Sequence, residues 1–244
     1  MGLSRGIALW AALCSCCAVN AEPLRLVADT WPPFTDASLP NNGLASDLVS
    51  AVLQRAGYSS EYIEVPWARA LRGLQAGDYD VALGAWYDAQ RAQYGLFSEA
   101  YLVNRIRFLQ RKGADIQFDQ LEDLRPYRIA TVRGYAYQAQ FDQDARLHKV
   151  PVMGFAMGAR MLAAGRVQLT LEDELVARYY LKGELHALQG QLEFLPKPLS
   201  ENGLHILVRR SHPQHRQIVA AFNRALREMR ADGSYAQIFQ RHGF

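Results

Sequence analysis

The sequence predicts an α/β protein of two lobes, and two observations favour this fold class. Short apolar runs typical of strands alternate with amphipathic runs typical of helices, which is the pattern of mainly parallel sheets flanked by helices. The alternation fills the first part of the chain and restarts near residue 127. The chain of 244 residues is long enough for two lobes of about 100 residues each.

The first run of elements reads strand, helix, strand, helix, strand. Residues 24–28 alternate enough to form a strand, which Pro32 and Pro33 end. Residues 43–57 carry leucines at positions 44 and 48, one helical turn apart, and end at a glycine, as an amphipathic helix does. The remaining elements of this run are a strand over 61–65, a helix over 67–76 and a buried strand over 80–84.

The second run follows a strand over 105–110 and a helical turn over 121–124. Its expected strands cover 127–132, 148–152 and 167–171, and its expected helices cover 135–144, 155–164 and 173–181. Strands over 192–195 and 204–208 and helices over 213–229 and 234–241 complete the chain.

Extended segments near 108–112 and 196–204 join the two runs, so we expect two crossings between the lobes. The C-terminal helices then return to the first lobe, which would hold residues 22–110 and 203–244, while 111–202 would form the second. Ligands of such sheets bind beyond the carboxyl ends of the strands. We therefore expect the binding site in the cleft between the lobes.

Composition excludes several classes of protein. Half of the residues are hydrophobic, 11% are aromatic and 21% are charged, which excludes wholesale disorder, collagen and coiled coil. The formal charge is +3, and the basic residues are mixed with acidic ones, so nucleic acid is not an expected partner. The mean hydropathy is −0.16 and the one long apolar run is N-terminal, which argues against an integral membrane protein.

The N-terminus resembles a secretory signal peptide over residues 1–21. Arg5 precedes an apolar run over 7–19, which is too short to span a bilayer, and Val19 and Ala21 suit cleavage before Glu22. Processing as a lipoprotein is the less favoured alternative, because the segment around Cys16 resembles a lipobox only loosely. We therefore expect an exported, periplasmic protein.

Cysteine usage narrows the chemistry further. All three cysteines, Cys14, Cys16 and Cys17, lie in this N-terminal segment, so the mature chain would have none. That excludes disulfides, thiol catalysis and cysteine-ligated metal centres from the mature protein. The chain also lacks a P-loop, a G-x-S-x-G elbow and an H-E-x-x-H motif. We expect no cofactor and no metal.

Seven short motifs carry a family resemblance. They are L-V-A-D-T-W-P-P-F (26–34), G-L-A-S-D-L (43–48), G-D-Y-D-V-A-L-G (77–84), Q-R-A-Q-Y-G-L-F-S-E-A-Y (90–101), I-A-T-V-R-G-Y (129–135), L-A-A-G-R-V-Q-L-T-L-E-D (162–173) and D-G-S-Y-A-Q-I-F (232–239). In that order they resemble the bacterial extracellular solute-binding proteins of family 3, over residues 22–244. The resemblance implies a two-lobed, type II periplasmic binding protein-like fold with two hinge crossings, which closes on its ligand like a Venus flytrap.

The resemblance also implies a function: a monomeric receptor that captures a small polar solute for the permease of an ABC importer. Within it, Arg91 matches the residue that binds the ligand's α-carboxylate, and a guanidinium forms a bidentate pair with a carboxylate. Asp173 matches the residue of the second lobe that binds the ammonium. Each has a structural alternative, since Arg91 could be a surface residue and Asp173 a helix N-cap, and Glu172 could take the ammonium instead.

Aromatic residues would supply the walls of the site. Trp31 follows the first strand and Trp67 begins a helix, at positions where the resemblance places two opposed walls, with Trp86 as a third candidate. A place in the core is the alternative for each tryptophan. Asp29 could bind the distal part of a ligand or cap its own turn.

Two departures from the family pattern bear on the ligand. Hydroxyl residues usual before the arginine are replaced by the segment 84–88, which includes Trp86 and Asp88, and Tyr135 stands where a threonine is usual. Asp88 could neutralise Arg91. We therefore expect a larger, flatter or more aromatic solute than a standard amino acid.

Two other functions remain open on this fold. A periplasmic enzyme resembling cyclohexadienyl dehydratase would use Glu172 or Asp173 as acid and base. A receptor for a sensor or chemoreceptor would bind its solute in the same way but serve no importer. We expect a binding protein and not an enzyme.

Overall fold

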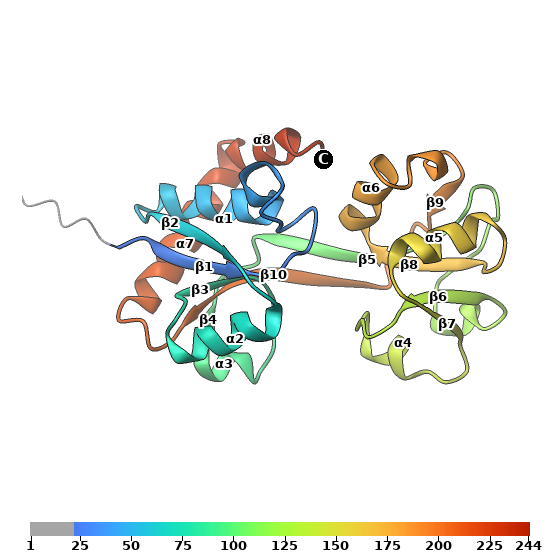
Figure 1. Cartoon of the computed structure of the whole chain (residues 1–244), viewed down its shortest axis with the longest axis horizontal. Coiled ribbons are helices and arrows are strands. Elements are labelled where there is room, and N and C mark those ends of the chain that lie inside the picture. Colours follow the sequence, from blue (N-terminus) through green and yellow to red (C-terminus); the bar gives the residue numbers. More distant parts are fainter. Residues whose placement is uncertain (1–21) are drawn as a thin grey trace, which may run out of the picture.

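The computed structural model describes residues 22–244, so the expected signal peptide and its lipoprotein alternative lie outside the described residues. Two lobes stand side by side and are joined by two long strands (Figure 1). The elements of the first lobe are β1 (Leu24–Ala28), η1 (Pro40–Asn42), α1 (Leu44–Arg55), β2 (Ser60–Glu64), α2 (Trp67–Ala76), β3 (Val81–Trp86), α3 (Arg91–Tyr94), β4 (Gly95–Phe97), α7 (His215–Ala231) and α8 (Ser234–Arg241).

The second lobe repeats the alternation of strands and helices. Its elements are η2 (Leu121–Leu124), β6 (Arg128–Val132), α4 (Ala139–Gln143), β7 (His148–Val152), α5 (Phe155–Ala163), β8 (Leu169–Asp173), α6 (Glu174–Lys182), η3 (His186–Leu188) and β9 (Leu192–Phe194). None of the helices within 22–244 has the length and apolarity needed to cross a membrane.

The joining strands β5 (Leu102–Arg111) and β10 (Ser200–Arg209) are antiparallel partners that belong to both lobes. Neighbouring strands follow the order β2-β1-β3-β10-β5-β8-β6-β7, with β4 beside β10 and β9 beside β5. Strand β5 pairs with β10 up to Ile106 and with β8 from Ile106 onward. It therefore joins the second lobe a few residues before the boundary at 110 that the sequence suggested.

Each lobe has its own apolar core. In the first lobe, α7 contributes Ile218, Phe222 and Leu226, spaced one turn apart and fully buried against α1 and the sheet. In the second lobe, Phe108 and Phe141 lie on one face of the sheet, in a different cluster from the residues that pack beneath α5. Because residues 22–244 contain no cysteine, this burial and the hydrogen-bonded sheet hold the described fold together.

The structure corrects several element boundaries. The helix expected over 135–144 is only the five residues of α4, because the Asp142 carboxylate accepts the N–H groups of Tyr137 and Gln138 at 3.0 and 3.1 Å and starts the helix there. Residues 133–138 therefore form a loop. The strand expected over 167–171 is shifted by two residues to β8, and α3 and β4 had no counterpart among the expected elements.

Candidate functional site

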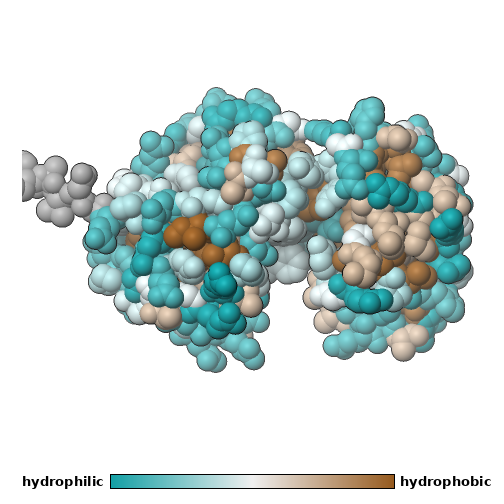
Figure 2. Space-filling view, viewed as in Figure 1, coloured by the Kyte–Doolittle hydropathy of each residue, from teal (hydrophilic) through white to brown (hydrophobic). Residues whose placement is uncertain are grey.

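A cleft of about 390 Å³ lies between the lobes and is the candidate site. Figure 2 shows the hollowed junction where the two lobes meet. All seven residues singled out from the sequence line this cleft: Asp29, Trp31, Trp67, Trp86, Arg91, Tyr135 and Asp173. The alternative acid Glu172 lines it too. The fold thus brings together residues that are up to 144 positions apart in the chain, counting from Asp29 to Asp173.

The cleft lies where parallel strands end. Strands β1 and β3 are parallel neighbours in the first lobe, and β6 and β8 are parallel neighbours in the second, so their carboxyl ends meet at the junction. Two glycines line the cleft at these ends, Gly84 with φ of 61° and Gly134 with φ of 81°. Both angles disfavour other residues, and glycine places no side chain in the cleft at either position.

Arg91 is the cation of the first lobe. Its guanidinium donates to the Trp86 carbonyl at 3.1 Å and lies 5.5 Å from the centre of the Trp67 ring. The expectation that Asp88 could neutralise Arg91 is wrong: the Asp88 carboxylate instead accepts the backbone N–H groups of Gln90 and Arg91, each at 2.9 Å. Within residues 22–244, no carboxylate forms an ion pair with this guanidinium.

Asp173 ends β8 and is the N-cap of α6. One carboxylate oxygen accepts the N–H groups of Leu175 and Val176 at 2.9 and 3.1 Å, and the other accepts the Asn104 amide at 3.1 Å and the Arg105 N–H at 3.2 Å. A carboxylate has about four acceptor positions, so these four donors use them all. Burial raises the pKa of Asp173 to about 6, although the hydrogen bonds oppose that rise.

Glu172 is the second acid of this lobe and is only 4% exposed. One of its oxygens accepts the Asp173 N–H at 2.9 Å. Burial raises the pKa of Glu172 to about 8, and the neighbouring charge of Asp173 adds to the rise. Burial therefore favours the protonated form of this carboxyl group, and a cation bound beside it would favour its ionised form.

Aromatic rings form much of the remaining lining. The rings of Trp31 and Trp86 meet edge to face with their centres 6.4 Å apart. Tyr135, 53% exposed, stands across from them on the β6–α4 loop, 6.0 Å from the ring of Tyr137. Asp29 follows β1, and burial raises its pKa, with a smaller contribution from the charge of Glu64.

Asn104 is not among the residues that the sequence predicts for the site. This residue is fully buried in β5, and its side-chain oxygen accepts the indole N–H of Trp86 at 2.8 Å. A signal was present: Leu102, Asn104 and Ile106 share the inward face of β5, and an amide among apolar side chains requires hydrogen-bond partners. Tyr137 was missed as well, since it was assigned to the expected helix.

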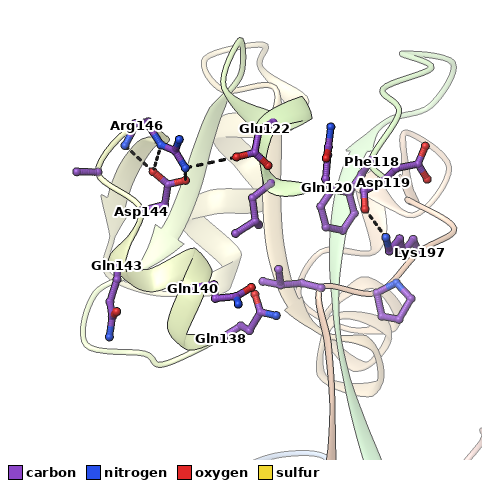
Figure 3. Close-up of a pocket in the computed structure, with 14 residues that line it drawn as sticks. Phe118, Asp119, Gln120, Glu122, Gln138, Gln140, Gln143, Asp144, Arg146 and Lys197 are labelled. Carbon is purple, nitrogen blue, oxygen red and sulfur yellow. Dashed lines mark hydrogen bonds and ion pairs between the residues drawn. The ribbon is translucent and has the colours of Figure 1, made fainter.

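A larger hollow, of about 830 Å³, lies on the second lobe beside η2 and α4 (Figure 3). Its cations already have partners within the hollow: Arg146 pairs with Asp144 at 2.8 Å and Glu122 at 3.4 Å, and Lys197 donates to the backbone oxygen of Asp119. It contains one aromatic residue, Phe118. The inter-lobe cleft, with its unpaired cation and several rings, is the stronger candidate. Among residues 22–244, no three metal-ligating side chains lie together.

Comparisons with known proteins agree with this geometry. The family model of the bacterial extracellular solute-binding proteins, family 3, matches residues 25–244. The lysine/arginine/ornithine-binding periplasmic protein of Escherichia coli (strain K12) is 26% identical over 253 aligned residues, covering 99% of this chain and 93% of the relative. The L-cystine-binding protein of Bacillus subtilis (strain 168) is 23% identical, covering 86% and 76%.

Solved structures share the fold. An ancestral cationic amino acid solute-binding protein superposes with a TM-score of 0.72 at 22% identity, covering 90% of this chain and 94% of that one. The predicted fold class, a type II periplasmic binding protein-like fold, is therefore confirmed. Because the family model matches nearly the whole chain, the chain belongs to the bacterial extracellular solute-binding proteins, family 3.

Proposed function

We propose that this protein captures an amino acid-like solute with a flat or aromatic side group in the inter-lobe cleft and delivers it to an ABC importer in the periplasm. The observation that carries the proposal is the Arg91 guanidinium, which faces the cleft without a carboxylate partner among the described residues. A cation held by a ring and a carbonyl oxygen is ready to bind a carboxylate.

The ammonium group of such a solute would lie near the acids of the second lobe. Asp173 has all its acceptor positions in use, whereas Glu172 donates none and accepts one N–H. We therefore assign the direct contact with the ammonium to Glu172. Asp173 would hold Glu172 in position. An ammonium next to Glu172 would ionise that carboxyl group, so binding would release a proton near neutral pH.

The side group would lie between aromatic walls. Trp31, Trp67 and Trp86 from the first lobe and Tyr135 from the second give the cleft flat surfaces suited to a ring or a planar cation. Asp29, at the end of β1, would favour a side group that carries a donor or a positive charge. These roles rest on the placement of the side chains in one cleft.

The role in import rests on the relatives. One is named a lysine/arginine/ornithine-binding periplasmic protein, one an L-cystine-binding protein and one an ABC transporter arginine-binding protein. In the proposed cycle the solute contacts both lobes only when they are closed, so binding shifts the population toward the closed form. That form would then be recognised by a permease. A sensor that recognised the same closed form would bind the solute identically, and loss of uptake on deletion of the gene separates the two roles.

Thermal shift measurements test the proposal. A panel of standard L-amino acids, polyamines and aromatic amino acids is added to the full chain, because a solute that binds the folded state raises its melting temperature. We expect the largest shift with an aromatic or planar-cation amino acid. Equal shifts with simple aromatic acids that lack an ammonium would contradict the role of Glu172. The absence of any shift would contradict the proposed solute class.

A second candidate function is acid–base catalysis, favoured by the buried Glu172 whose carboxyl group is protonated near neutral pH. A dehydratase acting on cyclic amino acids would need such an acid in this cleft. Incubation with prephenate or arogenate, followed by detection of product, decides between the functions. Binding without turnover supports the receptor, and turnover that is lost in Glu172→Gln supports the enzyme.

A further inference from the structure

A line of hydrogen bonds crosses from one lobe to the other through a single buried side chain. The indole N–H of Trp86, at the end of β3, donates to the Asn104 side-chain oxygen at 2.8 Å. The Asn104 amide nitrogen donates to Asp173 at 3.1 Å. Asp173 in turn accepts the first free N–H groups of α6, those of Leu175 and Val176. The line thus runs from an aromatic wall of the first lobe to a helix of the second.

The chemistry of the three groups fixes the orientation of the amide. An indole N–H only donates and an ionised carboxylate only accepts, so the Asn104 oxygen must face Trp86 and its nitrogen must face Asp173. Asn104 is fully buried, so water cannot replace either partner. Loss of one partner would leave a buried polar group unpaired, which is costly.

The position of Asn104 in the fold is that of a pivot. It lies in β5 opposite Asn202 of β10, in the stretch where these two strands pair with each other between the lobes. Two residues further along, at Ile106, β5 begins to pair with β8 of the second lobe. A rotation of one lobe against the other must therefore change the surroundings of Asn104 or be limited by its two bonds.

We infer that Asn104 is a positioning residue that ties Trp86 of the first lobe to the start of α6 in the second lobe and thereby sets the angle between the lobes. This inference rests on the proposed function in one respect only. If a solute stacks on Trp86, its binding would alter the position of α6 through Asn104. Asn104 itself is not expected to touch the solute, because Trp86 and Asp173 line the cleft and Asn104 does not.

Several titratable groups surround this line and must be considered in a pH experiment. Glu172 precedes Asp173 in β8, and Asp29 of β1 and Arg91 of α3 face the same cleft. On the other side of Asp173 lies a second hollow of about 290 Å³. Charged and titratable groups from four elements line it. These are Arg105 of β5, Glu174 of α6, Arg230 of α7 and Tyr235 of α8. All of them are present in the wild type, so a wild-type series at each pH corrects for their titration.

The test is Asn104→Asp, measured without any solute. At about pH 5.5 the introduced carboxyl group beside Asp173 should hold a proton, because two adjacent carboxylates cannot easily both ionise. In that form it can donate to Asp173 and accept from Trp86 as the amide does. At about pH 8.5 both groups ionise and repel each other. Residual dipolar couplings of the weakly aligned full chain then report the angle between the lobes, and the Trp86 indole signal reports the hydrogen bond.

We expect the lobe angle and the indole shift of Asn104→Asp to match those of the wild type measured at about pH 5.5, and to differ from those of the wild type measured at about pH 8.5. A folded Asn104→Asp that keeps the wild-type angle at both pH values overturns the inference. Should this variant fail to fold, Trp86→Phe removes the donor but keeps a ring on the cleft surface. Its lobe angle should depart from wild type at both pH values, and an unchanged angle overturns the inference.

The outcome is independent of the solute. If the panel of solutes fails but the lobe angle changes as described, the proposed ligand is wrong and the positioning role stands. If a solute binds but the angle is insensitive to both variants, the positioning role is wrong and the proposed function stands.

Discussion

The two walls of the cleft present charge in different ways. In the first lobe, Arg91 is held by the Trp67 ring and the Trp86 carbonyl and has no carboxylate partner among the described residues. In the second lobe, Asp173 is 1% exposed and accepts four hydrogen bonds, and Glu172 beside it is 4% exposed. One lobe thus offers a free, always charged group, while the other offers acids that are buried, occupied or protonated.

In the proposed site, the two ends of a zwitterionic solute would therefore be recognised by different physics. A guanidinium keeps its charge at every relevant pH, so binding of a carboxylate should depend little on pH. An ammonium bound at Glu172 would favour the ionised carboxylate, so its recognition would be linked to the release of a proton.

Glu172→Gln should have the largest effect, on the pH dependence of stability. The folded-state pKa of about 8 lies above the ordinary value of 4.5. Between these values the unfolded chain binds fewer protons than the folded one, so the free energy of unfolding falls as pH rises through this window. The variant should remove a few kcal/mol of that fall. Denaturant melts at several pH values measure it, with Glu228→Gln on the exposed face of α7 as control. Identical slopes for wild type and Glu172→Gln would contradict the assignment.

Arg91→Ala should weaken binding of the best solute from the panel by about 100-fold, since a charge-assisted bidentate pair is lost. The folded protein should survive, because the guanidinium makes one hydrogen bond to a carbonyl. Titration calorimetry measures the dissociation constant. Arg72→Ala, on the exposed face of α2, is the matched control and should bind as the wild type does. Equal affinities of the two variants would contradict a direct contact with Arg91.

Asp173→Ala should lower the free energy of unfolding by about 2 kcal/mol, because α6 loses its cap and the Asn104 amide loses its acceptor. Asp173→Asn keeps an oxygen for the cap and should lose less. Chemical denaturation of both variants gives the comparison. If the alanine variant is as stable as the wild type, the four hydrogen bonds do not stabilise the fold as described.

Trp67→Leu should have the smallest effect, a loss of affinity of about 5-fold, because Arg91 loses the ring on which it stacks. Trp67→Phe keeps a ring face, so its affinity for the solute should lie between those of the wild type and of Trp67→Leu. Calorimetry under the conditions used for Arg91→Ala gives both constants. Wild-type affinity in the leucine variant would show that the ring does not orient the guanidinium.

Local sequence signals predicted much of the fold, and the family resemblance predicted the site residues. Arg91 follows a short buried strand, and Asp173 stands at the junction of a strand and a helix, so each lies near a strand's carboxyl end. The family is confirmed by the match over residues 25–244. The roles of the seven cleft residues in binding, and the exact division into lobes, stay predictions.

Contacts between distant residues could not be predicted in this way. The hydrogen bonds of Asn104 join residues 18 and 69 positions apart, and nothing in the neighbouring sequence specifies either partner. The helix predicted over 135–144 begins only at residue 139, because the Asp142 carboxylate caps it there and leaves Tyr135 in a loop. The sequence suggests that Asp88 pairs with the side chain of Arg91. Its carboxylate instead accepts the backbone N–H groups of Gln90 and Arg91, which lie nearer along the chain.

The shared strands β5 and β10 have a mechanical consequence. Their backbones are hydrogen-bonded to each other across the junction, from Leu102 beside Leu204 to Ile106 beside Ser200. Rotation about one or two isolated bonds would break this ladder, so a change in the angle between the lobes must be spread as a small twist over several residues of both strands. Such a pair of strands should resist twisting and return to its original geometry when the solute dissociates. Reopening of the two lobes after the solute dissociates would then require no separate energy source.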